Sequence, residues 1–259
     1  MDARETILAI YRTASERELT VHAAAFAYYA FVSLIPLVLL ALVVGSLLGG
    51  ERVAARLVLV AGELLPAAGE ELLVEVLTTE AGRAEATLVA VVVAGWGALK
   101  VFRGLSLAFD RIYGTVAEKS FVEHVVDGIA VIVAVAGGLV LMIVLGYLLG
   151  AAPVVPFGWL LGWFGLFAGL TIVFFPIYYL LPPIEIELQE ALPGTVVAAI
   201  GWTLLQAGFQ LYAANAARYE AYGALGAVIL LVTWLYFAGI VILLGAVVNV
   251  VRDEAAAAA

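Results

Sequence analysis

The chain has 259 residues, of which 65% are hydrophobic and only 13% are charged. A soluble domain usually carries about twice that charged share, so the composition excludes an ordinary water-soluble protein. The net charge is −9 and there is no cysteine. The acidic balance argues against a nucleic-acid-binding surface, which would be basic, and the lack of cysteine excludes disulfides and thiolate chemistry.

Four long runs of the chain contain no charged residue, and they predict membrane-spanning helices. They cover 23–50, 128–184, 191–217 and 221–251. One crossing of the hydrocarbon core needs about 20 apolar residues, so the 57 residues of the second run provide two crossings and a turn. We therefore predict an all-α polytopic bundle, a single multi-pass domain of the cell membrane, with six transmembrane helices at 23–49, 84–108, 128–150, 159–181, 193–215 and 224–251.

Three further segments flank or connect these spans. Residues 2–19 mix apolar and charged side chains with helical spacing, which suits a helix lying in the membrane interface and equally a solvated helix. Residues 50–83 are acidic and amphipathic and are expected outside the cytoplasm, whereas 252–259 form a tail. After the acidic connector 182–192, Pro193 is expected to be the first helical residue of the fifth span.

The distribution of Lys and Arg predicts that both chain ends are cytoplasmic. With the N-terminus inside, the inner segments contain Arg4, Arg12, Arg17, Lys100, Arg103, Arg111, Lys119 and Arg252. The outer segments contain Arg52, Arg56, Arg83 and Arg218. Cytoplasmic loops carry the excess of cations, so eight against four favours this orientation.

The second span, 84–108, is the weakest by hydropathy because Lys100 and Arg103 lie in its last third. Together with Asp110 they fall within roughly 80° of one another on a helix. Ionisable residues in a span usually face the bundle interior or a watery cavity, which predicts a site for an anionic headgroup or substrate. The alternative is that both cations extend to the phosphates of the inner leaflet.

Polar and kinking residues in other spans offer a weaker signal. Gln206 and Gln210 share a helix face and need partners in hydrocarbon, so they line a translocation path or bond between helices. Pro36 and Pro176 each remove a backbone hydrogen bond and predict kinks. Broken helices recur at the substrate sites of transporters, although proline kinks also occur in membrane proteins that transport nothing.

The motifs of the common enzyme classes are missing. The sequence has no GxxxxGK[ST], HExxH or GxSxG pattern, and we interpret His22 and His124 as structural. We therefore expect no enzymatic activity, cofactor or metal. Two lysines against ten arginines, with an acidic balance, favour either a halophilic source or a GC-rich genome.

Several stretches resemble the YihY/BrkB family of inner-membrane proteins. They are HAAAFAYYAFVSLIPLVLL (22–40), AFDRIYG (108–114), YYLLPP (178–183) and the whole of 191–251. The residues that carry or accompany the resemblance are Tyr28, Tyr29, Ser33, Pro36, Pro176, Pro193, Gly194, Tyr222, Gly223, Trp234, Gly245 and Asn249. The chain departs from the family pattern at Asp110, often Asn there, at Thr195, often Ala, and at Val247, commonly Glu.

The resemblance implies a six-helix inner-membrane protein of poorly defined activity. Some members carry a ribonuclease BN label that this sequence does not support, and others are linked to serum resistance and to export of lipid-like molecules. Our leading hypothesis is a non-enzymatic protein, with membrane lipids as partners, that binds or translocates an amphipathic anionic molecule such as a lipid. The alternatives are a scaffold that docks a protein partner through 50–83 and, last, a membrane ribonuclease.

Overall fold

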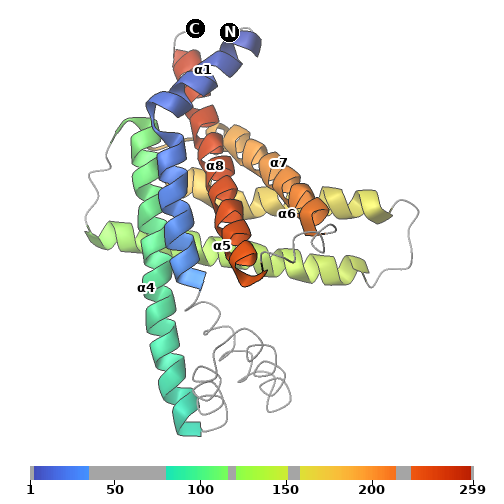
Figure 1. Cartoon of the computed structure of the whole chain (residues 1–259). Helices are drawn as coiled ribbons and strands as arrows, with labels where there is room; N and C mark the ends of the chain where they lie inside the picture. The colour runs from blue at the N-terminus through green and yellow to red at the C-terminus, as the bar shows by residue number, and fades with distance from the viewer. Residues whose placement is uncertain (1–2, 35–79, 116–120, 151–157, 214–222, 258–259) are drawn as a thin grey trace. The chain divides into compact units, whose positions relative to one another are not determined.

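The computed structural model describes residues 3–34, 80–115, 121–150, 158–213 and 223–257, and the regular elements among them are all helices (Figure 1). The helices are α1 (Ala3–Glu16), an unlabelled helix Leu19–Leu34, α4 (Glu80–Tyr113), α5 (Phe121–Gly150), α6 (Gly158–Leu180), α7 (Leu188–Ala213) and α8 (Gly223–Ala257). The predicted all-α class is therefore confirmed. Pro36, Tyr222 and nearly all of the segment 50–83 lie outside the described residues.

The chain divides into two compact units, one made of residues 1–28 and 102–259 and the other of 29–101. In the first unit, α1 packs on α8, α8 on α7, α7 on α6 and α6 on α5. The two ends of the described chain consequently lie side by side, where α1 meets the C-terminal part of α8 (Figure 1).

Small residues allow the helices of the first unit to approach closely, as is usual between membrane helices. Ala198, Ala199 and Ala246 are fully buried in the core. A Cβ added to Gly201 would lie 2.8 Å from Val241 on α8. The sequence of small residues therefore sets the spacing between α7 and α8.

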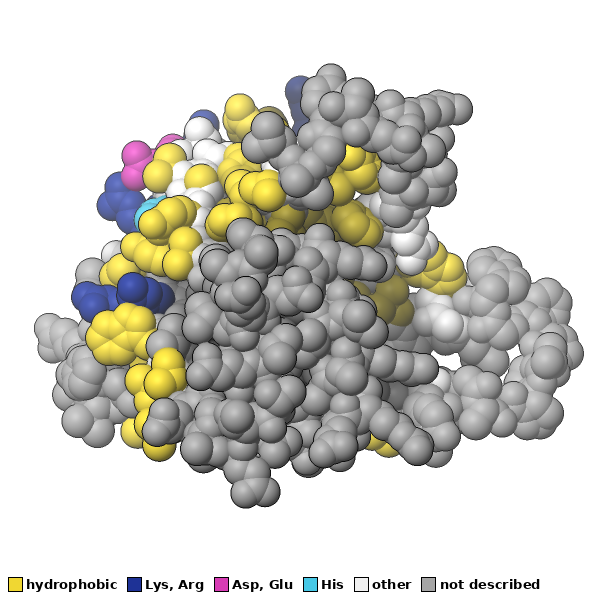
Figure 2. All heavy atoms as spheres, turned by 60° about the horizontal axis from the view of Figure 1, so that its bottom comes forward, with side chains coloured by type: hydrophobic (Ala, Val, Ile, Leu, Met, Phe, Trp, Pro, Cys, Tyr) yellow, Lys and Arg dark blue, Asp and Glu magenta, His cyan; other side chains and the backbone are white. Residues whose placement is uncertain are grey.

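The outward face of α5 is apolar. Val126, Ile129, Val133 and Val140 share one helix face and are 52–64% exposed. Figure 2 shows one side of the molecule, on which the described side chains are largely hydrophobic and the charged ones gather in few places. Soluble monomers rarely expose contiguous apolar surface of this kind, so the natural surroundings of such a face are lipid.

Three of the described helices are long and apolar enough to cross a membrane: Gly162–Leu180, Leu188–Tyr212 and Val228–Ala257. They fall on the predicted fourth, fifth and sixth spans. The helix Leu19–Leu34 and the stretch Val126–Met142 of α5 are apolar but shorter. α4, the weakest predicted span, is continuous over 34 residues.

The expectation that Pro193 is the first helical residue is wrong, because α7 begins at Leu188 and Pro193 lies inside it. The backbone N–H of Glu187 donates to Oε2 of Glu190 at 2.7 Å, which is half of a capping box. This cap starts the helix more than a turn before the proline.

Candidate functional site

An exposed face of α4 carries the two cations that the sequence singled out. Lys100 and Arg103 are both exposed, and so are Trp96 at 65% and Leu107 at 55%. The spacings of four, three and four residues place all four side chains within about 60° on this helix. Nζ of Lys100 lies 5.9 Å from the centroid of the Trp96 ring. We call Trp96, Lys100, Arg103 and Leu107 the α4 stripe.

Asp110 does not share the exposure of the two cations. It is only 8% exposed, next to the fully buried Phe109 and Ile112. Its carbonyl oxygen accepts a hydrogen bond from the N–H of Gly114 at 3.0 Å. Spacing alone placed Asp110 near the cations, but it lies two turns beyond Arg103, where α4 enters the buried core, so a similar direction around the helix no longer means exposure.

Beside the stripe, Gly97 of α4 forms a close helix contact within the second unit. The hydroxyl of Ser33 donates to the carbonyl oxygens of Tyr29 at 2.6 Å and of Gly97 at 3.2 Å. Ser33 is 4% exposed, and a Cβ on Gly97 would lie 3.3 Å from it. Ser33 therefore joins two helices, whereas Tyr28 and Tyr29 are exposed.

A buried polar network connects α6, α7 and α8. The hydroxyl of Tyr178 donates to the carbonyl of Ile242 at 2.6 Å, and the N–H of Gly194 donates to Oδ1 of Asn249 at 2.6 Å. A Cβ on Gly194 would meet the carbonyl oxygen of Gly245, and one on Gly245 would meet the Tyr178 hydroxyl. These residues hold α7 against α8 in the core and do not form an open site.

Tyr113 lies next to this network at the end of α4, beyond the predicted second span. The pKa of Tyr113 is raised to about 12, mainly by burial; the neighbouring Asn249 side chain lowers it, and the carboxylates of Asp253 and Glu190 add to the rise. Neither the Tyr113 hydroxyl nor Nδ2 of Asn249 reaches hydrogen-bonding geometry. The phenol therefore stays protonated at neutral pH.

The remaining predicted residues that the structure describes are not gathered into one site. Gln206 is partly buried, whereas Gln210 is exposed. Trp234 packs edge-on against Trp202 with ring centroids 5.3 Å apart. Pro176 lies inside α6, and Gly223 begins α8.

Comparison with known proteins decides the family. The sequence pattern of the virulence factor BrkB family matches residues 10–259. The chain belongs to the BrkB family. This confirms the resemblance seen in the sequence.

Relatives of this BrkB-family protein carry two kinds of name. The ribonuclease-like protein YfkH of Bacillus subtilis is 40% identical over 31% of this chain and 30% of its own length. A UPF0761 membrane protein of Pseudoalteromonas translucida is 38% identical over 30% of this chain and 27% of its own length. A UPF0761 membrane protein of Idiomarina loihiensis is 32% identical over 36% of this chain and 33% of its own length. The alignments thus span about a third or less of these relatives, and no solved structure gives a significant match.

The BrkB-family chain is a membrane protein, as its relatives' names and its apolar helices indicate. Among the described residues, no group of three or more His, Asp or Glu could hold a metal ion. The sequence pointed to Lys100 and Arg103 but missed Trp96 and Leu107. Their positions four residues before Lys100 and four after Arg103 were the available signal, hidden because aromatic and aliphatic residues are common throughout this chain.

Proposed function

We propose that this protein crosses the cell membrane six times with both ends in the cytoplasm, and that it binds and translocates an amphipathic anion of the lipid class. The observation that carries the proposal is the α4 stripe. Its two exposed cations lie between an exposed aromatic ring and an exposed leucine. A lipid has the matching chemistry, since an anionic headgroup is joined to apolar chains.

The side chains of the stripe suit a phosphate headgroup. The Arg103 guanidinium can bind two phosphate oxygens at once, and Lys100 supplies a point charge. Trp96 lies under the Lys100 ammonium, and such a contact is worth about 0.5–1 kcal/mol at an exposed site. Tryptophan also favours the boundary between hydrocarbon and headgroups. The stripe therefore suits the level at which a lipid headgroup enters.

A flipping assay tests the proposal. The protein is reconstituted into liposomes that contain a fluorescent anionic phospholipid, and dithionite reports how fast the inner-leaflet label becomes accessible. We expect faster flipping than in protein-free liposomes. The double variant K100Q/R103Q loses two charge-assisted contacts of about 1.5 kcal/mol or more each, which together predict at least about a hundredfold lower rate.

A control variant separates recognition from general loss of charge. R12Q/R252Q removes two exposed cations from other helices and is expected to flip the lipid within about twofold of the wild-type rate. If no phospholipid flips faster than in empty liposomes, translocation is refuted. If K100Q/R103Q flips the lipid as fast as the wild type, the cations only anchor α4 at the headgroups.

A further inference from the structure

The α1 helix has three distinct sides. Ala9, Ile10 and Ala14 pack against the core of the first unit, where α1 contacts α8. A second side is apolar but uncovered, with Ile7 67%, Leu8 57% and Tyr11 74% exposed. The third side is charged. Because the sequence shows only apolar and charged positions, the division of the apolar ones between core and surface comes from the structure alone.

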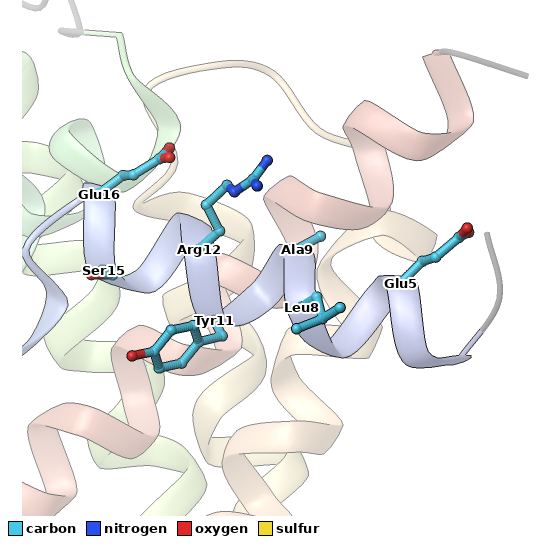
Figure 3. A pocket seen from close by; sticks show the side chains of 7 residues that line it. All are labelled: Glu5, Leu8, Ala9, Tyr11, Arg12, Ser15 and Glu16. Atoms are coloured by element: carbon cyan, nitrogen blue, oxygen red, sulfur yellow. The ribbon is translucent and has the colours of Figure 1, made fainter.

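Glu5, Arg12 and Glu16 share the charged side, whereas the exposed Arg4 falls on the apolar side near the start of the helix, from where its long side chain can extend to the headgroups. Figure 3 shows Glu5, Arg12 and Glu16 pointing to one side of α1, whereas Leu8 and Tyr11 point to the other. A shallow hollow lies beside the helix, and Leu8, Tyr11 and Arg12 are among the residues that line it. Glu5 and Glu16 line the hollow as well, so it lies where the apolar side of α1 meets the charged side.

The place of α1 in the chain indicates what covers the apolar side. After α1, the chain turns at Glu18, whose φ is 53°, and enters the helix Leu19–Leu34, where the charge-free run begins at Ala23. The end of α8, on which α1 packs, is where the charge-free run 221–251 stops at Arg252. Both charge-free runs, 23–50 and 221–251, thus have one end close to α1, which is where the boundary between membrane and water is expected.

We propose that α1 lies in the membrane surface, with Ile7, Leu8 and Tyr11 among the lipid acyl chains, Glu5, Arg12 and Glu16 in water, and the side that carries Ala9, Ile10 and Ala14 on α8. The occupant of the apolar side is lipid. Arg4 and Arg12 balance Glu5 and Glu16, so the helix has no net charge. The binding of α1 to the membrane therefore depends on burial of its apolar side and not on attraction to anionic lipid. The proposal for α1 is independent of whether the protein flips lipids.

The absence of cysteine from the chain allows a direct test with single spin labels. L8C and Y11C place the label on the proposed lipid side, and the matched controls E5C and E16C place it on the charged side. Each labelled full-length protein is placed in nanodiscs of phosphatidylcholine alone. Power saturation then compares collisions with oxygen, which concentrates in lipid, and with a water-soluble nickel chelate.

We expect labels at positions 8 and 11 to favour oxygen and those at 5 and 16 to favour the nickel chelate, with little change between low and high salt. The proposal is overturned if positions 8 and 11 favour the nickel chelate as strongly as the controls do, since that side would then face water. It is equally overturned if they collide with neither reagent, which would show that a protein surface, such as a second copy of the chain, covers them. Gel filtration of each labelled variant checks that it remains folded.

Discussion

At the residue scale, the close crossing of α7 and α8 depends on the absence of a Cβ atom at Gly245. In G245A, the new Cβ would meet the Tyr178 hydroxyl and, at 2.6 Å, the carbonyl oxygen of Gly194. Neither atom can move without breaking a buried contact, so we expect the variant to lose about 1–3 kcal/mol of unfolding free energy. Denaturant unfolding in detergent micelles measures the change.

A second glycine-to-alanine variant is expected to change the unfolding free energy in the opposite direction. It therefore controls for the effect of alanine itself. Gly137 lies in α5 with no atom within 4 Å of its would-be Cβ. G137A gains helix propensity of up to about 1 kcal/mol and loses nothing to crowding. Equal effects of G245A and G137A would contradict the close crossing.

At the scale of a helix, α4 shows how an element ends. Gly114 follows the last helical residue, Tyr113, with a φ of 73°, and its N–H closes the final turn on Asp110. A residue with this left-handed conformation commonly terminates a helix. We expect G114A to destabilise the protein by about 1 kcal/mol, measured by the same unfolding assay. G114N is expected to lose less, because asparagine tolerates this region, and an alanine variant as stable as the wild type would argue against the strained cap.

The sequence predicted where helices occur better than where they begin and end. Long charge-free runs mark apolar helices reliably, because lipid tolerates few charges. The start of α7 was missed because a proline at the edge of an apolar run looks like a first helical residue, while the capping Glu190 lies in a segment that seemed to be only an acidic connector. Likewise, periodicity identified the cations of α4, but the burial of Asp110 depends on partners that one helix cannot reveal.

At the scale of the whole molecule, the topology is open to a direct test. The N- and C-terminal helices α1 and α8 pack together. This agrees with an even number of membrane crossings, which would place both chain ends on the same side. We expect green fluorescent protein fused to either end to fluoresce and alkaline phosphatase fused there to be inactive. A phosphatase inserted within 50–83 should be active. Activity at one chain end only would require an odd number of crossings.

The contact between Gly194 and Gly245 also has a mechanical meaning. Where two backbones touch, no rotatable side chain lies between them to absorb a sliding or tilting movement, and Asn249 binds the two helices again one turn further along. α7 and α8 should therefore move together as one rigid body, the α7–α8 plate. A conformational cycle in this protein would have to move other helices against that plate, so distance measurements between α7 and α8 should stay constant while those involving α4 or α5 change.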